Sequence, residues 1–316
     1  MIRRRYVVLD VFTDRAFAGN PLAVVLDAEG LDEAAMQTIA REFNLSETVF
    51  VRPAEKPGHS AGLRIFTPAR ELPFAGHPTV GAAVLLAEER FGTPDRGLDA
   101  VVVMEEKVGA IRAAVRLDPD RPTYAEFDAP RLPVAVTRDP PAKGAIADAL
   151  GVDAADVGFE NHVPSFHDAG VPFAFVPLAG LDAVARARLD PRLWSAAVGA
   201  EENFSVFVYC RETRLHDSAF HARMFDHGFG IGEDPATGSA AAAFAGVVAA
   251  FDTPTEGVHR LRIEQGFEMG RPSLIDLTIE VAKGRLAATR IGGAAVRVAE
   301  GELLTPAPGA SGRLRD

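Results

Sequence analysis

The chain repeats itself, and this feature constrains its fold more than any other. Residues 19–25 (GNPLAVV) read like residues 170–176 (GVPFAFV). Four more matches follow in the same order, each pair about 150 to 160 residues apart: 30–32 with 180–182, 44–46 with 203–205, 64–66 with 223–225, and 77–83 with 234–240. Matches in one order at nearly constant spacing indicate two homologous halves related by a pseudo-twofold axis, rather than two unrelated domains of similar composition.

Each half mixes strands and helices. Apolar, β-branched runs predict strands at 6–12, 23–26, 48–51, 101–104, 109–117, 204–209 and 274–281. Helical spacing predicts a helix from Asp32, as N-cap, to Phe43. Two further helices are expected from Pro78 to about Arg90 and from Pro235 to about Ala250. The last two are apolar nearly all round, so each should be buried within its own domain.

The length of 316 residues suits two domains better than one. Prolines interrupt regular structure between residues 118 and 141, and the boundary is placed at 128–142. The predicted domains are therefore residues 1–130 and 140–304, followed by a mobile tail at 305–316.

Composition narrows the partners and the compartment. A net charge of −11 disfavours nucleic acid and anionic membrane surfaces. The single cysteine, Cys210, cannot form an internal disulfide, which favours a reducing compartment. The basic start lacks a signal core, and the longest apolar stretch, residues 240–251, is too short to span a bilayer. We expect a cytoplasmic protein with no membrane or nucleic-acid partner.

Two dipeptides that end in proline, His77-Pro78 and Asp234-Pro235, predict helix starts that could bind an anion. A residue before proline avoids the helical region, and proline suits the first helical position, so His77 and Asp234 are predicted N-caps. The N–H groups of the three residues after each proline, 79–81 and 236–238, would then point outward and could bind an anion. If both helix starts face one cleft, they converge on one small acid. Ordinary helix capping is the alternative.

Glu47 breaks the pattern of a predicted strand. Alternation places it on one face with Val49 and Val51, and the second half has no matching carboxylate, since Ser205 is followed directly by Val206. A charged side chain at one of two pseudo-equivalent positions suggests an asymmetric acid/base. The alternative is an exposed glutamate at a strand end.

The remaining motifs do not predict a nucleotide site, a metal site or a nucleophilic cysteine. The glycine-rich stretch 228–239 lacks the lysine and the spacing of a phosphate-binding loop. The spacing of the histidines at 162, 167, 216, 221 and 227 does not fit a zinc helix, so surface or capping roles are expected. Cys210 lies in an apolar run and is expected to be buried and inert. We predict no metal and no cofactor.

Several longer motifs resemble one family, the phenazine-biosynthesis PhzF-like proteins. They are residues 10–13 with Gly19-Asn20-Pro21, residues 44–48, 66–68, 71–78, 233–241, 265–266 and 269–272. The resemblance covers nearly the whole chain, and the motifs together are specific to the family.

The resemblance implies an α+β fold like that of diaminopimelate epimerase: two pseudo-symmetric domains, each a curved mixed sheet wrapped around a central helix, with the active site between them. It also implies a homodimer without cofactor or metal, Glu47 as catalytic residue, and supporting roles for the residues that match the family's motifs: Asn20, Gly76, His77, Asp234, Gly238 and Ser239. The stretch Asp226-His227 departs from the Ala-Pro of many relatives, which leaves the substrate open.

We therefore predict a cofactor-independent isomerase that moves a carbon-bound proton in a small carboxylic acid. Glu47 would be the general acid/base, with a pKa raised by partial burial. His77 and Asp234 would hold polar groups of the substrate, while Ser239 and the two helix starts would bind its carboxylate. The alternatives are an epimerase or dehydratase of a small amino or hydroxy acid, and a small-acid binding protein without activity.

Overall fold

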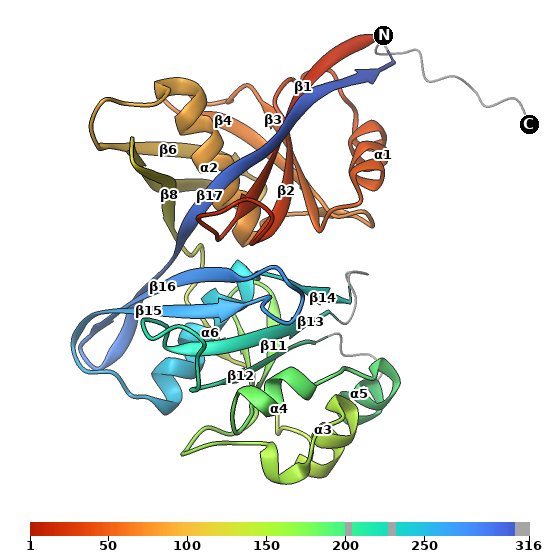
Figure 1. The fold of residues 1–316 in the computed structure, drawn as a ribbon, viewed down its shortest axis with the longest axis vertical. Coiled ribbons are helices and arrows are strands. Elements are labelled where there is room, and N and C mark those ends of the chain that lie inside the picture. Colours follow the sequence, from red (N-terminus) through yellow and green to blue (C-terminus); the bar gives the residue numbers. More distant parts are fainter. Residues whose placement is uncertain (200–203, 227–231, 307–316) are drawn as a thin grey trace, which may run out of the picture. The chain divides into compact units, whose positions relative to one another are not determined.

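The computed structural model describes residues 1–199, 204–226 and 232–306. The chain forms two compact units, coloured in sequence order in Figure 1. The first unit holds Met1–Phe17, Pro21–Ala125 and the segment from Ala294 onward, and the second holds Ala18–Asn20 and Glu126–Gly293. The C-terminal strand thus belongs partly to the first unit. Thr305 is still paired within that strand, and residues 307–316 of the expected tail lie outside the described residues.

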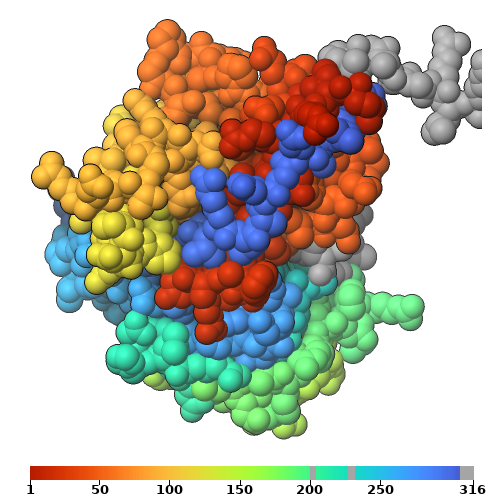
Figure 2. Space-filling model, turned by 45° about the horizontal axis from the view of Figure 1, so that its top comes forward, coloured from red at the N-terminus to blue at the C-terminus, as the bar shows by residue number. Residues whose placement is uncertain are grey.

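In the first unit, strands surround one long helix. Its elements are β1 (Ile2–Val11), β2 (Asn20–Val25), α1 (Glu33–Phe43), β3 (Glu47–Arg52), β4 (Ala61–Phe66), β5 (Glu71–Leu72), α2 (Gly76–Phe91), β6 (Leu98–Glu106), β7 (Gly109–Asp118) and β8 (Arg121–Asp128), which leads into the second unit. Strand β2 is parallel to β3, β3 is antiparallel to β4, β4 is antiparallel to β5 and parallel to β6, and β6 is antiparallel to β7. Strand β1 pairs with the end of β17 (Arg285–Thr305), and Figure 2 shows the two segments side by side at the surface.

The second unit repeats the strand order around its own long helix and contains additional short helical segments. Its elements are β9 (Val134–Ala135), α3 (Lys143–Leu150), a 3₁₀ turn (Ala154–Asp156), β10 (Ser165–Asp168), β11 (Pro172–Pro177), α4 (Leu181–Arg186), α5 (Pro191–Val198), β12 (Ser205–Cys210), β13 (Phe220–Phe225), β14 (Glu233–Asp234), α6 (Gly238–Phe251), β15 (Gly257–Gln265) and β16 (Ser273–Ala282). Strands β11 to β16 pair in the same senses as β2 to β7. The predicted internal repeat is therefore confirmed, as are the seven predicted strands and the α+β class.

The central helices explain why each unit is stable. Most residues of α2 and α6 are buried, and each helix packs against several strands of its own unit (Figure 1). Alanine and glycine dominate the buried residues of α6 and are frequent among those of α2, which lets the strands approach closely. A Cβ on Gly81 would lie 2.6 Å from the Leu22 side chain. The predicted burial of both helices is confirmed.

One helix start was predicted correctly and two were not. Asp32 caps α1, and its carboxylate accepts the Ala35 N–H at 2.8 Å. In contrast, α2 begins at Gly76, so His77 lies inside its first turn and is not the N-cap. Proline is tolerated anywhere in the first turn, where its missing N–H has no helical partner, so Pro78 did not mark the start.

The start of α6 was also wrong. Helix α6 begins at Gly238 with Thr237 as N-cap, and Asp234 lies earlier, in β14, opposite Met224. Pro235 belongs to the loop between strand and helix. The N–H groups expected to be free are therefore also different, since the Thr237 N–H bonds to Gln265.

The fold corrects how the two halves align. Each has a two-residue strand, three loop residues that begin with Pro73 or Pro235, and then a helix that begins at glycine. By this alignment the counterpart of His77 is Ser239, not Asp234. A shared ion pair supports it: Arg64 binds Glu71 through two hydrogen bonds (2.6 and 2.5 Å), as Arg223 binds Glu233 (2.7 and 2.9 Å).

Candidate active site

Glu47 and His77 lie together in the first unit. Glu47 is the first residue of β3, opposite Leu22 of β2, and its side chain is 15% exposed. His77 lies in the first turn of α2, with its side chain 4% exposed. The Glu47 Oε2 atom is 3.5 Å from the His77 Nδ1 atom. The carboxylate therefore has access to solvent on one side and an imidazole on the other.

His77 is neutral in this setting. Burial lowers the pKa of His77 to about 3, because the charged ring would lose its hydration. Its contact with Glu47 is thus between a carboxylate and a neutral ring, not an ion pair. A neutral imidazole donates from one nitrogen and accepts at the other, so it can orient a carboxylate or a substrate oxygen.

The starts of α2 and α6 are not capped by side chains. The N-cap of α2 is Ala75, which has no polar side chain, and the N-cap Thr237 of α6 makes no capping bond. The first N–H of α6 to bond back is that of Ala241, which donates to Thr237 O at 3.0 Å. The N–H groups of Gly238 and Ser239 therefore have no acceptor within the helix and are suited to an anion.

Asp234 is held in place by two buried amides. The Asn20 Nδ2 donates to Asp234 Oδ1 (2.8 Å) and to Ala236 O (2.9 Å). The Gln265 Nε2 donates to the Asp234 carbonyl (2.7 Å). Asn20, predicted to bind substrate, is fully buried and contacts Asp234. Gln265 was not singled out as a site residue, although it lies within one of the family-like motifs.

The structure brings the candidate residues together in two groups. Gly76, His77 and Glu47 belong to the first unit. In the second unit, Asn20 contacts Asp234, Asp234 accepts from Thr237, and Thr237 directly precedes the helix start Gly238-Ser239. Ser239 is partly exposed, whereas Gly238 is buried.

The strand register identifies the counterpart of Glu47. Leu22 pairs with Glu47 in the first unit, and Phe173, the counterpart of Leu22, pairs with Ser205 in the second. The expected asymmetry is therefore present, although sequence matching had placed Val206 there. The Ser205 hydroxyl donates to Asp226 Oδ1 at 3.2 Å. The other half of the Asp226-His227 departure, His227, lies outside the described residues.

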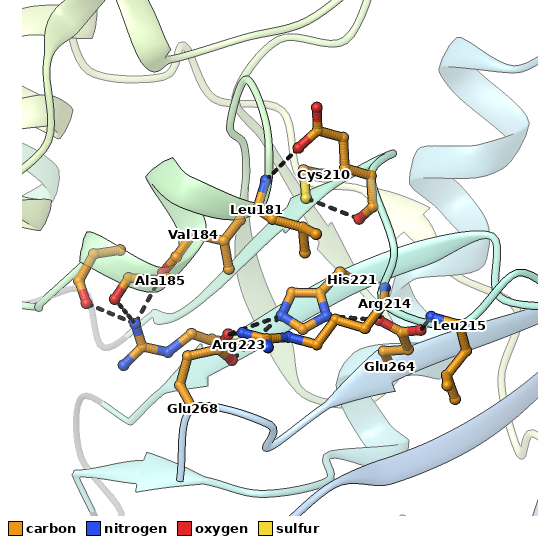
Figure 3. Close-up of polar contacts among 12 residues, drawn as sticks. Leu181, Val184, Ala185, Cys210, Arg214, Leu215, His221, Arg223, Glu264 and Glu268 are labelled. Atoms are coloured by element: carbon orange, nitrogen blue, oxygen red, sulfur yellow. Dashed lines mark hydrogen bonds and ion pairs between the residues drawn. The ribbon is translucent and has the colours of Figure 1, made fainter. Parts of the chain in front are cut away.

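Three histidines for which surface or capping roles were expected are buried: His162, His167 and His221. His221 lies between two carboxylates, with Nδ1 2.8 Å from Glu264 and Nε2 3.1 Å from Glu268 (Figure 3). Acids contact two of these rings, those of His221 and of His162, whose Nε2 lies 2.9 Å from Asp252, and sequence spacing does not reveal such pairs. Within the described part of the chain, no three His, Cys, Asp or Glu side chains form a group that could hold a metal ion.

Cys210 matches its prediction. Its thiol is fully buried and donates to the Glu212 carbonyl at 3.2 Å. Burial raises the pKa of Cys210 to about 12, which keeps the thiol protonated and unreactive.

Comparison with known proteins now gives the family. Residues 9–301 match the model of the phenazine biosynthesis-like proteins, PhzC-PhzF. The chain belongs to this family. An uncharacterized isomerase of Mesorhizobium japonicum is 53% identical over 96% of this chain and 99% of its own. Trans-2,3-dihydro-3-hydroxyanthranilate isomerase of Pseudomonas aeruginosa is 33% identical over 94% of this chain and 98% of its own.

Solved structures agree with the family. The PhzF-family phenazine biosynthesis protein of Bacillus anthracis has a TM-score of 0.85 and 26% identity, covering 96% of this chain and all of its own. A hydroxyproline epimerase of Agrobacterium vitis shares the fold alone, with a TM-score of 0.63 at 12% identity over 95% and 91% of the two chains. The chain is thus a PhzF-like isomerase with an epimerase-like α+β fold. The described residues include no helix that is long and apolar enough to cross a bilayer.

Proposed function

We propose that this enzyme is a cofactor-independent isomerase in which Glu47 removes a proton from one carbon of a small carboxylic acid and returns it to another. The observation that carries the proposal is the Glu47–His77 pair, in which a partly exposed carboxylate lies 3.5 Å from a buried neutral imidazole. A base must be reachable by substrate, yet sheltered enough that proton transfer is favourable near neutral pH. The partial exposure of Glu47 meets both needs.

A single residue, Glu47, both accepts and returns the proton in the proposed reaction. The C–H bond of the substrate breaks, its electron pair moves into the adjoining unsaturated system, and the proton joins a Glu47 carboxylate oxygen. Glu47 then gives this proton to the carbon at the far end of the shifted double bond. Neutral His77 cannot supply a proton as an imidazolium, so we assign it a hydrogen-bonding role toward Glu47 or the substrate.

The substrate carboxylate would be bound at helix starts. We propose that the first-turn N–H groups of Gly76-His77 in α2 and of Gly238-Ser239 in α6 serve this binding, with Asp234 holding a further polar group of the substrate. Two features support this: the helix starts are counterparts in the repeat, and neither has a side-chain cap. Such N–H groups stabilise an anion through hydrogen bonds and the helix dipole.

The substrate class follows from the relatives. One relative with 33% identity is named trans-2,3-dihydro-3-hydroxyanthranilate isomerase, so an unsaturated cyclic acid with hydroxyl and amino groups is the first substrate to test. Shifting a proton between carbons of such a ring needs one base and a held carboxylate, which are the two parts proposed here.

The test is hydrogen exchange with solvent. The enzyme is incubated with trans-2,3-dihydro-3-hydroxyanthranilate in D₂O, and NMR follows isomerisation and deuterium uptake at carbon. Glu47→Gln removes the base and keeps the shape, so it should lower turnover by at least about 100-fold. Glu42→Gln, an exposed change on α1, is the matched control and should retain activity.

Three outcomes contradict the proposal in different ways. Folded Glu47→Gln with activity within about tenfold of the wild type would show that Glu47 is not the base. Exchange without a shift of the double bond would favour an epimerase. Binding of this acid and of a panel of amino and hydroxy acids, with no exchange in any, would leave a binding protein.

A further inference from the structure

Gln265, the last residue of β15, is fully buried and uses its whole carboxamide. Its Nε2 donates to the Asp234 carbonyl (2.7 Å) and to Thr237 Oγ1 (3.0 Å). Its Oε1 accepts the Thr237 N–H (3.1 Å). We propose that Gln265 is a positioning residue that keeps the start of α6 open for the substrate. This inference rests on the proposed function, which assigns carboxylate binding to that helix start.

The hydroxyl of Thr237 shows what the amide achieves. A threonine at the N-cap ordinarily accepts an N–H from the first turn and so closes the helix start. Here the Thr237 hydroxyl receives the Gln265 N–H and donates to Asp234 Oδ2 (2.6 Å), and it makes no capping bond. The Ser239 N–H, which such a cap could engage, is thereby left, together with that of Gly238, for an external acceptor.

The backbone on both sides of Gln265 is fixed. The Glu264 carboxylate accepts the N–H groups of Arg214 (2.9 Å) and Leu215 (2.6 Å) and contacts His221, as Figure 3 shows. Gly266 follows with a φ of +76°, and a Cβ there would lie 2.6 Å from the Pro235 carbonyl. The loop after β15 therefore packs closely against Pro235, within the segment that Gln265 binds, and this packing restricts the position of the amide.

The first unit has a carboxyl group at the same place. Ala61 pairs with Met104 as its counterpart Phe220 pairs with Ile263, which makes Glu106 the counterpart of Gln265. The preceding residues also match, since Glu105 accepts two loop N–H groups, of Glu55 and Lys56, as Glu264 does. The scaffold is thus shared, and the amide is particular to the second unit.

An amide is required there because the three partners differ in kind. The Asp234 carbonyl can only accept, and the Thr237 N–H can only donate. A carboxylate at position 265 would satisfy the second and repel the first. A protonated carboxyl could satisfy both, so Gln265→Glu should work at low pH and fail at high pH.

The experiment compares Gln265→Glu, Gln265→Leu and a control, Ile263→Val, which alters the same buried strand without touching Asp234 or Thr237. The first readout is the NMR amide signals of residues 238–240. The second is KM and kcat for trans-2,3-dihydro-3-hydroxyanthranilate at about pH 6 and about pH 9, relative to the wild type. For Gln265→Glu we expect KM within about threefold of the wild type at the lower pH and at least about tenfold higher at the upper pH, with kcat little changed.

The two readouts separate the possible failures. Unchanged amide signals in both Gln265 variants would overturn the positioning role, whatever the activity. Changed signals with an unchanged KM would show that the start of α6 does not serve the reaction, and the inference falls with that part of the proposed function. If the wild type turns over no acid, the proposed function fails, and the amide signals still decide whether Gln265 positions the helix start. If KM rises as much in Ile263→Val as in Gln265→Leu, Gln265 contributes only to stability and the positioning role is overturned.

Discussion

Glu106, at the end of β6, provides a test of the electrostatics of the first unit. It is buried, and burial raises the pKa of Glu106 to about 8. Hydrogen-bond counting agrees: the Thr79 hydroxyl has one proton but lies 2.7 Å from Ala75 O and 2.8 Å from Glu106 Oε1. If Glu106 is protonated, it donates to Thr79, and Thr79 donates to Ala75. We expect the folded enzyme to hold Glu106 as a neutral acid.

The effect on stability has a definite sign. The pKa of Glu106 is 4.5 when unperturbed and about 8 in the folded state, so between these values the folded state holds more protons than the unfolded state. Stability contributed by this group is complete at low pH and declines as the pH rises toward 8, by about 1.4 kcal/mol per unit and about 5 kcal/mol in all. Glu106→Gln removes this titration and keeps the shape.

Urea unfolding of the wild type and Glu106→Gln measures the difference at two pH values. The stability of the variant relative to the wild type should rise by about 4 kcal/mol between about pH 5 and about pH 9. Glu55→Gln, exposed and equal in charge change, is the control and should show no such rise. A relative stability that stays constant within about 1 kcal/mol would refute the neutral buried acid.

Three further predictions concern single groups. Gly266→Ala should lower the free energy of unfolding by more than about 2 kcal/mol, because the added Cβ would lie 2.4 Å from Arg271 O. The control Gly270→Ala, at a φ of +70° but in open space, should lower it by about 1 kcal/mol. Equal losses of the two variants in urea unfolding would contradict this prediction. His77→Gln should slow turnover without moving the acid limb of the pH–rate profile, since a pKa of about 3 lies below it; a moved limb would mean that His77 titrates. Burial alone would lower the pKa of His221, but the bonds to Glu264 and Glu268 raise it. The contribution of this group to stability is therefore complete at acid pH and is lost as the pH rises through the raised pKa. His221→Gln should flatten this part of a profile of melting temperature against pH, and an unchanged profile would contradict the raised pKa.

The sequence was sufficient for seven of the strands, for the presence of the three longest helices and for the internal repeat. Apolar periodicity predicted the strands, and Asp32 marked the start of α1 because capping is a local interaction. The starts of α2 and α6 were missed because Pro78 and Pro235 are compatible with several positions near a helix start. The similarity of His77-Pro78 to Asp234-Pro235 then suggested a wrong alignment of the halves, which the matching strand, loop and helix boundaries corrected.

The candidate site was predicted only in part, because a sequence reveals local patterns and not contacts between distant segments. Glu47 was found because it breaks an apolar strand pattern, which is visible in one segment. Its contact with His77 depends on where β3 and α2 meet, and the grip of Gln265 on Asp234 depends on the end of β15; neither leaves a local pattern. Buried polar pairs of this kind need the fold before they can be seen.

The repeat itself favours a single base. What the two units share is structural: the Arg64–Glu71 and Arg223–Glu233 pairs, and loops held by counterpart glutamates. What differs lies where chemistry is proposed, since Ser205 and Ser239 take the places of Glu47 and His77. A two-base racemase needs an ionisable group on each side of the substrate carbon, but a serine hydroxyl is a poor base without a partner, and that of Ser205 donates to Asp226. This difference at the positions of Glu47 and His77 fits our proposal that a single base, Glu47, both removes and returns the proton.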